Sequence, residues 1–315
     1  MKHIFVVNPH AGKAKAKEMI EQMLIGFKYE YEIYYTKGNK DATRFVRETC
    51  ENTPNDRVRF YACGGDGTIK EVAEGVYGHE NVDFSAVPLG SGNDFVKYYG
   101  GADKFMDLNK LAEADSDFID LIKVNDEICI NVCNFGFESY VAKTMDEVRH
   151  KKLIGGKNSY TTGIVKALLC AMKNKADIYV DGERINNGEY LLGTVANGKY
   201  EGGAYKVAPR SLNNDGILDV CVANVISVLS FVRLINVYKE GKHLDDPRFD
   251  SIVTYRRGKK IEVRCNEKNT IALDGELVEV QNFTCEVIHR AVRFAALEIK
   301  AEKNEQEIST YTALI

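Results

Sequence analysis

The sequence has no run that approaches the ~18 consecutive apolar residues that a helix needs to cross a bilayer. Its first residues, Met1–Pro9, become polar too soon for a secretory signal, and they predict a short buried strand instead. We therefore expect a cytoplasmic protein. Any contact with a membrane is expected to be peripheral and transient, at the inner face of that membrane.

Paired cysteines are missing as well. The eight cysteines form no Cys-x-x-Cys motif, and no two histidines have the spacing of metal ligands on a helix. This pattern argues against structural zinc, and a disulfide framework is not expected in a chain of 315 residues. We interpret most of the cysteines as small buried apolar residues.

An excess of positive charge is also absent. The chain has 42 Lys and Arg against 46 Asp and Glu, a formal net charge of −4. No overall basic field is available to hold nucleic acid, so we expect no nucleic-acid partner. The hydrophobic and charged fractions, 44% and 28%, are ordinary for a globular protein, and 315 residues favour two domains.

The first third of the sequence alternates between patterns typical of strands and of helices. We predict strands at 3–7, 29–36, 58–63 and 84–87, and helices at 13–24, 41–51 and 69–76. This alternation indicates a mostly parallel sheet with helices on both faces, an α/β domain of three layers. We place this domain at residues 1–122.

From about Asp120 onward, short alternating runs dominate the sequence. We predict strands at 120–124, 128–135, 176–180, 190–197, 218–222, 252–255, 260–264, 270–273 and 283–288, and helices at 160–174 and 225–239. The pattern indicates an antiparallel sandwich or barrel, of which we take the β-sandwich, at residues 123–299. The tail, 300–315, is predicted to pack back on the first domain.

The loop Gly64-Gly65-Asp66-Gly67-Thr68 follows a predicted strand and precedes a predicted helix. Glycine lets the backbone approach a ligand, and the N–H groups at the start of the helix can hold phosphate oxygens. A tight turn without a ligand is the alternative interpretation. Asp66 favours a ligand, because a carboxylate beside phosphate is unfavourable unless it serves a metal ion or a substrate hydroxyl.

Other phosphate motifs do not fit the sequence. No Gly-Lys pair is followed by Ser or Thr, so there is no Walker A loop, and the dinucleotide fingerprint around the glycine loop is incomplete. His289-Arg290-Ala291 lacks the aspartate of a protein-kinase catalytic loop. Two further loops, 8–13 and 90–94, follow predicted strands, and we expect all three loops to converge on one crevice.

Taken in order, these motifs resemble the diacylglycerol kinase catalytic domain family, in particular its bacterial soluble lipid kinases, with sphingosine and ceramide kinases as relatives. The resemblance runs through most of the chain. It is carried by Asn8-Pro9, Gly12-Lys13, Gly64–Thr68, Gly90–Phe95, Ala196–Gly198, Gly202-Gly203, Ala208-Pro209, Asp215–Asp219 and Leu273–Glu276. Ser91 replaces the more usual threonine, and Lys70 stands where the family often has asparagine.

The resemblance implies an ATP-dependent and Mg²⁺-dependent phosphotransferase that acts on an alcohol group, most of all on diacylglycerol to give phosphatidic acid. Another lipid of the sphingosine or ceramide kind is an alternative acceptor, as is a soluble one such as NAD, whose kinases share the glycine loop. A non-catalytic nucleotide-binding protein is a third interpretation. The implied partners are ATP and a membrane lipid, and a homodimer is possible.

The same resemblance assigns site residues. The nucleotide contacts are Asn8, Pro9, Gly12, Thr36, Gly64, Gly65, Asp66, Gly67, Thr68 and Ser91. Glu276 is the proton acceptor with Asp274 as its partner, and Asp66, Asp94 and Asp120 are candidates to bind Mg²⁺. A structural Mg²⁺ is implied at Leu212, Asp215 and Ile217, through two backbone carbonyls and one carboxylate.

Several of these residues have plainer interpretations. Asp274-Gly275-Glu276 and Asp215-Gly216 are also ordinary turn sequences, Asp120 also suits a solvated strand start, and Thr36 also suits a strand end. The segments 140–173 and 225–243 place apolar residues beside Lys, Arg and His. They suit contact with an anionic bilayer or, equally, the role of amphipathic core helices.

Overall fold

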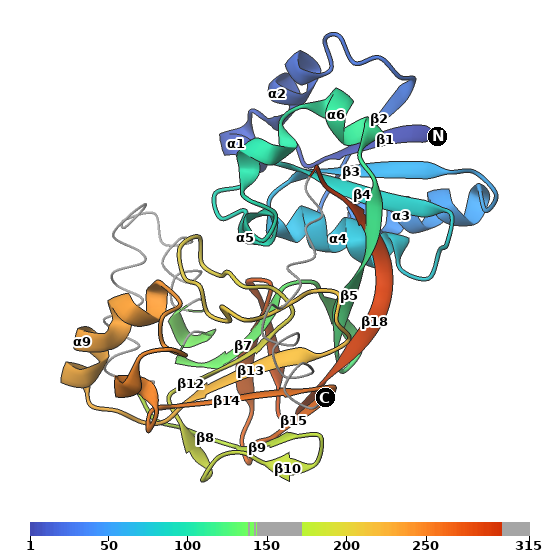
Figure 1. The fold of residues 1–315 in the computed structure, drawn as a ribbon. Coiled ribbons are helices and arrows are strands. Elements are labelled where there is room, and N and C mark those ends of the chain that lie inside the picture. The colour runs from blue at the N-terminus through green and yellow to red at the C-terminus, as the bar shows by residue number, and fades with distance from the viewer. Residues whose placement is uncertain (138, 142, 144–171, 298–315) are drawn as a thin grey trace, which may run out of the picture.

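The structure, a computed structural model, describes residues 1–137, 139–141, 143 and 172–297 (Figure 1). The predicted tail helix at 300–315 and nearly all of the helix predicted at 160–174 lie outside these residues. Asn174, the last residue of the helix predicted at 160–174, is described by the structure. It begins strand β8 (Asn174–Lys175) rather than ending a helix.

Four parallel strands form the sheet of the N-terminal part, in the order β4-β3-β1-β2. They are β1 (Lys2–Val7), β2 (Tyr31–Tyr35), β3 (Val58–Gly64) and β4 (Val82–Pro88). Strands β3 and β4 are buried along their whole length, as central parallel strands covered on both faces are. Helix α2 (Ala16–Met23) lies on one side of the sheet, and α3 (Asp41–Asn52) and α4 (Asp66–Val76) lie on the other (Figure 1). The predicted three-layer α/β arrangement is confirmed.

Three helices begin at other residues than predicted, and the one expected at 225–239 begins at Val228. The helix expected at 13–24 begins only at Ala16, because Gly12, Lys13 and Ala14 have φ values of 60°, 58° and 64°, which an α-helix does not allow. The helix expected at 69–76 begins earlier, at Asp66, so the end of the glycine loop is already the first turn of α4. The remaining short helical elements are α1 (Ala11–Ala14), α5 (Asp94–Lys97), η1 (Ala102–Phe105) and α6 (Leu108–Glu113).

The C-terminal part packs two sheets face to face. One is an antiparallel six-stranded sheet, β14-β13-β12-β7-β16-β17. The other contains β10-β9-β15-β18 together with β5 and β6. A separate two-stranded sheet pairs β11 (Glu189–Tyr190) with β8. The strands of the two packed sheets are β5 (Ser116–Val124), β6 (Glu127–Cys129), β7 (Val132–Gly136), β9 (Asp177–Val180), β10 (Glu183–Arg184), β12 (Leu192–Ala196), β13 (Leu218–Ala223), β14 (Val253–Gly258), β15 (Lys260–Arg264), β16 (Asn269–Leu273), β17 (Glu276–Val280) and β18 (Phe283–Ala295). Side chains such as Ile122, Phe135, Val220 and Ile261 fill the space between the sheets, so the predicted β-sandwich is confirmed.

Helix α9 (Val228–Lys239) covers the outer face of the six-stranded sheet, where Phe231 and Tyr238 pack against residues of β7 and β12. A short helix, η2 (Pro247–Phe249), follows it. None of the helices within the described ranges is long and apolar enough to cross a membrane. The seven cysteines that the structure describes are buried and unpaired, in line with the sequence-based interpretation.

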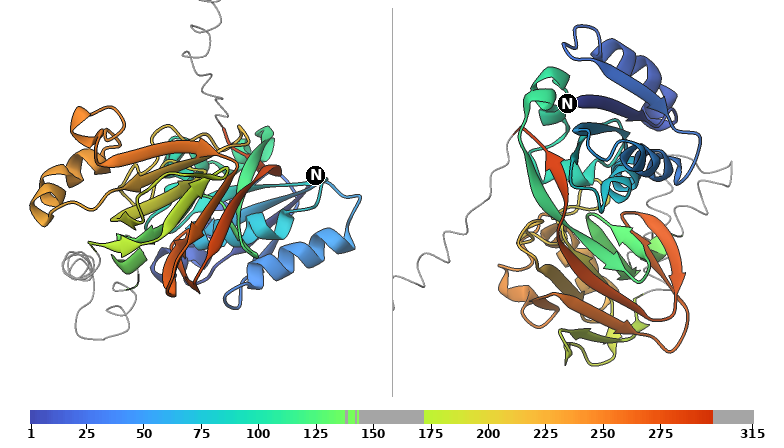
Figure 2. Two further views of the ribbon diagram at one scale, coloured as in Figure 1. Left: turned by 90° about the horizontal axis from the view of Figure 1, so that it is seen from below. Right: turned by 90° about the vertical axis from the view of Figure 1, so that its right-hand side faces the viewer.

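Strand β18 connects the two parts of the molecule. It pairs with β15 and β5 in the sandwich and reaches β4 in the parallel sheet, where Phe294 is the partner of Phe84. Figures 1 and 2 show β18 and β5 running side by side from one part to the other. The sheet that contains them therefore has ten strands and spans both parts. The proposed boundary at 122/123 stays a prediction, and β18 crosses back over it.

Several strand predictions need correction. The strand expected at 128–135 is two strands, β6 and β7, separated by a turn at Ile130–Asn131. The one expected at 190–197 is likewise divided into β11 and β12. Strands β10 and β17 were not predicted at all. Strand β5 begins at Ser116 rather than at 120, and β18 extends to Ala295 rather than ending at 288.

Candidate active site

The loops that follow β1, β3 and β4 lie against one another at the carboxyl edge of the parallel sheet. The Gly12 N–H donates to the Leu89 carbonyl at 2.9 Å, and the Leu89 N–H donates to the Gly64 carbonyl at 2.7 Å. The Asn8 side-chain amide lies 3.4 Å from the Thr68 hydroxyl. The three loops expected to converge are therefore in direct contact. Thr36 reaches the same edge, since its N–H donates to the Val7 carbonyl at 2.9 Å.

Glycine is required in this cluster by close packing. A Cβ on Gly90 would lie 2.5 Å from the Gly65 Cα, and a Cβ on Gly64 would lie 2.2 Å from the Thr68 hydroxyl oxygen. Neither distance is sterically possible. Asn93, at φ 51°, closes the third loop by exchanging two side-chain hydrogen bonds of 3.0 Å with the backbone of Gly90. The neighbouring Ser91 is exposed.

Asp66 stands in the first turn of α4 and accepts a hydrogen bond from the Phe95 N–H at 3.1 Å. The pKa of this carboxyl is raised to about 6, mainly by burial. The hydrogen bond from the Phe95 N–H lowers the pKa, and the nearby carboxylates of Asp94 and Asp274 raise it. The three aspartates are thus close enough to interact electrostatically. A concentration of negative charge of this kind is what a divalent cation neutralises.

Asp94 connects the third loop to the C-terminal part. Both of its oxygens lie 3.0 Å from the Gly203 N–H, and the Lys97 ammonium lies 2.6 Å from Asp94 Oδ1 and 2.6 Å from the Gly203 carbonyl. The sequence motif Gly202-Gly203 is therefore brought onto the motif around Asp94. Lys97, which the sequence-based prediction left out, completes this contact.

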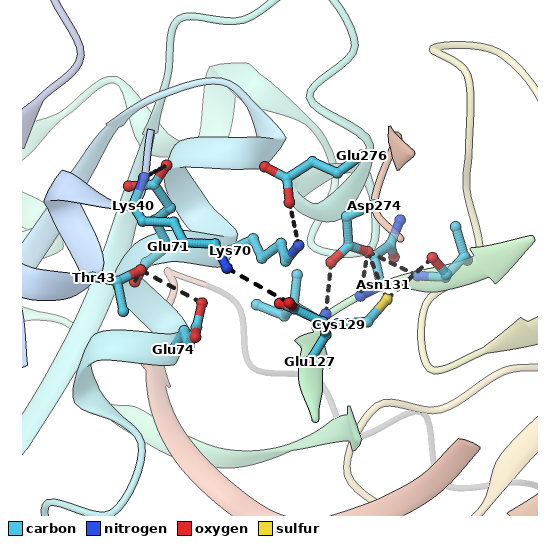
Figure 3. Close-up of polar contacts among 12 residues, drawn as sticks. Lys40, Thr43, Lys70, Glu71, Glu74, Glu127, Cys129, Asn131, Asp274 and Glu276 are labelled. Atoms are coloured by element: carbon cyan, nitrogen blue, oxygen red, sulfur yellow. Dashed lines mark hydrogen bonds and ion pairs between the residues drawn. The ribbon is translucent and has the colours of Figure 1, made fainter. Parts of the chain in front are cut away.

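Asp274 occupies the turn between β16 and β17, with φ 51°. Its carboxylate accepts hydrogen bonds from the backbone N–H groups of Ile130 at 2.8 Å, Asn131 at 2.9 Å and Val132 at 3.0 Å (Figure 3). The Cys129 thiol also lies 3.1 Å from it. Asp274 therefore holds the turn between β6 and β7 in place.

Glu276, two residues further on, faces the other domain. Its carboxylate forms an ion pair with the ammonium of Lys70 on α4 (Figure 3). The Lys70 side chain is 5% exposed and that of Glu276 is 41% exposed. Burial by itself would lower the pKa of Lys70, but the hydrogen bond to Glu276 and the nearby Asp274 raise it overall, so Lys70 is cationic. In the sequence, Lys70 was noted only because the family often has asparagine at this position. This unusual lysine was the one feature of the sequence from which the contact could have been suspected.

The second group of predicted metal residues lies elsewhere, around the loop before β13. Asp120 is fully buried and accepts hydrogen bonds from the N–H groups of Gly216 and Arg290, each at 2.7 Å, while the His289 ring nitrogen lies 2.8 Å away. The interpretation of Asp120 as a solvated strand start is wrong. Asp120 lies with the loop of Asp215, whose carboxylate accepts from the Ile217 N–H at 3.1 Å and pairs with Arg257.

Within the described ranges, no three His, Cys, Asp or Glu side chains gather closely enough to hold a metal ion by themselves. A cation at Asp66 and Asp94, or at Asp215 with the carbonyls of Leu212 and Ile217, would need further oxygen ligands. Phosphate oxygens, water and backbone carbonyls supply such ligands for Mg²⁺, which rarely has a full set of protein ligands. The oxygen-only donor set fits that ion.

Comparison with known proteins covers both halves of the fold. The model of the "Diacylglycerol kinase catalytic domain" matches residues 2–124, and that of the "YegS C-terminal NAD kinase beta sandwich-like domain" matches residues 131–296. The diacylglycerol kinase of Bacillus subtilis (strain 168) is 27% identical over 277 residues, covering 86% of this chain and 88% of that protein. A protein of Alcanivorax borkumensis named "Probable lipid kinase YegS-like" is 24% identical, covering 90% of this chain and 93% of the relative.

A solved structure shows the same fold. The crystal structure of a diacylglycerol kinase from Bacillus anthracis strain Sterne superposes with a TM-score of 0.67 at 22% identity, over 94% of this chain and 96% of that one. The two family matches follow one another in the chain, and the glycine loop and the Asp274–Glu276 turn come one from each. This chain therefore belongs to the YegS-like lipid kinase family, in which a diacylglycerol kinase catalytic domain precedes an NAD kinase beta sandwich-like domain, and it is an ATP-dependent kinase.

Proposed function

We propose that the protein transfers the γ-phosphoryl group of ATP to the free hydroxyl of diacylglycerol, giving phosphatidic acid. The observation that carries the proposal is the meeting of two half-sites. The glycine loop with Asp66 and Asp94 comes from the first domain, and the turn with Asp274 and Glu276 comes from the second. The ion pair between Lys70 and Glu276 and the contact of Asp94 with Gly203 join them.

In this proposal the three converging loops bind the nucleotide. The backbone N–H groups at the start of α4, and the positive end of that helix, suit the phosphates. The proposed contacts are those of the sequence-based set: Asn8, Pro9, Gly12, Thr36, Gly64, Gly65, Asp66, Gly67, Thr68 and Ser91. Their close packing, which excludes any side chain at Gly64 and Gly90, supports a backbone surface that a phosphate chain can approach.

Mg²⁺ is part of the proposal at Asp66 and Asp94, where, when bound, it neutralises charge on the phosphates. The mutual repulsion of Asp66, Asp94 and Asp274, which contributes to the raised pKa of Asp66, supports this location. A structural Mg²⁺ is proposed at Asp215 with the carbonyls of Leu212 and Ile217. Asp120 then serves that loop by fixing the Gly216 N–H.

Glu276 is the proposed general base. Glu276 begins β17, and its carboxylate is partly exposed. In this proposal it removes the proton of the lipid hydroxyl as that oxygen bonds to the γ-phosphorus. The bond from the γ-phosphorus to the β,γ-bridging oxygen breaks, and ADP leaves. Asp274, whose carboxylate already accepts from three backbone N–H groups, fixes the turn that presents Glu276.

The lipid is proposed to enter from an anionic bilayer that contacts helix α9. The apolar residues on the outer side of this helix and just before it are exposed: Val225, Val228, Leu229 and Val232. Residues 224–239 contain no Asp or Glu and carry Arg233 and Lys239. Exposed apolar and cationic side chains on one helix suit the interface of an anionic membrane. We thus place the protein in the cytoplasm with transient contact at the inner face. A homodimer stays a prediction.

The test is an assay of purified protein with γ-labelled ATP and Mg²⁺. Diacylglycerol, sphingosine and ceramide are offered in mixed micelles, and NAD is offered in solution. We expect labelled phosphatidic acid from diacylglycerol, and none in the absence of ATP or lipid. Label in sphingosine or ceramide phosphate alone would identify another lipid kinase. Label in NADP alone would place the chain with kinases of a soluble substrate that share the glycine loop.

A further inference from the structure

Lys70 is a buried cation that connects the two domains. It lies in the second turn of α4, with a side chain that is 5% exposed, and its ammonium reaches Glu276, which is 206 residues away in the sequence (Figure 3). An ammonium group loses its hydration when it is buried, and only an opposite charge in good geometry compensates for that loss. The buried ammonium of Lys70 is therefore stabilised by its ion pair with Glu276, together with the nearby carboxylate of Asp274.

The backbone that carries Lys70 is rigid. Helix α4 buries Ile69, Val72, Ala73 and Val76 in the core of the first domain, and the same helix begins at the glycine loop with Asp66. Asp66 and Lys70 are four residues apart, so they lie one above the other on one face of the helix. The distance from the glycine loop to the Lys70 ammonium is thus set by one turn of a packed helix.

The backbone that carries Glu276 is fixed from the other side. Asp274 is bound by the N–H groups of Ile130, Asn131 and Val132, which hold the start of β17. The Glu276 side chain itself is partly exposed and has several rotatable bonds, so its backbone alone does not decide where the carboxylate lies. The contact with Lys70 supplies that constraint.

We propose that Lys70 is a positioning residue that holds the Glu276 carboxylate at a fixed distance from the glycine loop and so aligns the proton acceptor with the γ-phosphoryl group. This inference rests on the proposed function, in which Glu276 is the general base. One helix then carries both the start of the phosphate site and the contact that places the base. A neutral side chain at this position leaves Glu276 without its partner.

The experiment compares Lys70→Met, which keeps the length but not the charge, with Lys70→Arg, which keeps the charge. We expect Lys70→Met to lower kcat for lipid phosphorylation about 10- to 100-fold, because loss of alignment costs rates of this order. The KM for ATP should stay within about twofold, since no nucleotide contact is removed. Lys70→Arg should recover a large part of kcat. In a Glu276→Gln background, Lys70→Met should have no further effect on the residual rate.

The matched control is Lys40→Met. Lys40 also forms an ion pair between the two domains, with Glu127 at 3.5 Å, but its side chain is 64% exposed and does not touch Glu276 (Figure 3). We expect it to leave kcat unchanged. If Lys70→Met is not folded by thermal unfolding, Lys70→Gln takes its place with the same expectations. An unchanged kcat, or a rise in the KM for ATP with kcat intact, would overturn the inference, as would an equal loss in the Glu276→Gln background.

Hydrogen exchange separates this inference from the proposed function. Amide exchange of β17 is measured without any substrate, in the wild type, Lys70→Met and Lys40→Met. Exchange at residues 276–280 that is several-fold faster only in Lys70→Met supports the positioning contact even if no lipid is phosphorylated. Unchanged exchange together with an inactive wild type would remove both proposals.

Discussion

Asp66 is the residue whose charge is most affected by its surroundings. Its pKa is raised from 3.8 to about 6, first by burial and then by Asp94 and Asp274. Between these two values the folded state binds more protons than the unfolded state, so stability falls as pH rises through this window. Above pH 6 the ionised form lowers the free energy of unfolding by up to about 3 kcal/mol, since each pKa unit corresponds to about 1.4 kcal/mol.

Asp66→Asn should therefore be more stable than the wild type at pH 7.5 and nearly equal to it at pH 4. Asparagine keeps the oxygen that accepts from the Phe95 N–H but carries no charge. The check is chemical denaturation at both pH values. We also expect Mg²⁺ to raise the melting temperature of the wild type more than that of Asp66→Asn, which keeps the proposed structural site at Asp215. Equal stability at pH 7.5 would show that burial and the neighbouring carboxylates do not destabilise the ionised Asp66.

Substitutions of Asp274 and of Glu276 should affect different properties, although the two residues are only two positions apart. The first should lower stability and the second should lower turnover. Asp274→Ala leaves the N–H groups of Ile130, Asn131 and Val132 without their acceptor, and each unsatisfied buried donor costs about 1–3 kcal/mol. We expect a loss of at least about 3 kcal/mol in the free energy of unfolding. Glu276→Gln should instead lower turnover about 10²- to 10⁴-fold, the usual contribution of a general base, while ATP binding and most of the stability remain. Denaturant titrations measure the free energy of unfolding, calorimetry measures ATP binding, and the lipid kinase assay measures turnover.

For single residues, the sequence was a better guide to which of them lie near one another than to the contacts that each of them makes. It named Asp66, Asp94, Asp274 and Glu276 from motifs far apart in the chain, and their roles stay predictions. The partners of Asp274 lie more than 140 positions away, since its contact to Val132 spans 142 residues. Lys70 was visible only as an unusual residue. A contact between distant segments depends on the tertiary fold, which local patterns do not contain.

Helix α9 is the element with apolar residues on two faces. Phe231 and Tyr238 pack on the six-stranded sheet, whereas Leu229 and Val232 are 60% and 56% exposed. A helix that needed only one packed face would carry polar residues on the other. Leu229→Ser combined with Val232→Ser should weaken binding to anionic vesicles several-fold and leave phosphorylation of a short-chain, water-soluble diacylglycerol unchanged. Sedimentation with vesicles that contain phosphatidylglycerol measures the binding.

The matched control is Ile25→Ser, which removes an apolar side chain that is 82% exposed on the first domain, directly after α2. We expect this variant to bind vesicles like the wild type. Equal weakening by both changes would indicate a nonspecific effect of surface hydrophobicity. Unchanged binding of the α9 variant would place the membrane contact elsewhere.

Element boundaries followed from the sequence where local physics decides them. Helix α3 begins at Asp41 as expected, and β15 has the predicted bounds, 260–264. Strand predictions failed where a distant residue stabilises an interruption of the strand. The turn at Ile130–Asn131, for example, is held by Asp274, which accepts hydrogen bonds from its N–H groups. Strand β17 was missed although Glu-Leu-Val-Glu-Val alternates between acidic and apolar residues.

The whole molecule depends on a strand that returns from the second domain to the first. Strand β18 pairs with β5 at eight positions and then places Phe294 among the aromatic rings of Phe84, Phe95, Tyr99 and Phe105, at centroid distances of 4.9 to 5.9 Å. Local sequence patterns predicted the α/β layers of the first domain and an antiparallel sandwich or barrel for the second. They did not predict this return, because nothing near residues 283–288 signals pairing with residues 116–124.

A fragment of residues 1–122, the predicted first domain, should therefore not fold cooperatively. It lacks the strand that pairs with β5, and it lacks Phe294, whose removal from an aromatic core alone costs about 3–5 kcal/mol. Joining residues 1–122 through a short glycine–serine linker to residues 283–297 restores both, since Ile122 and Val287 are neighbours across the ladder. We expect a cooperative thermal transition by circular dichroism for the joined chain and a broad one for the fragment. A sharp transition in the fragment near that of the full chain would mean that the parallel sheet and its helices hold together without β18.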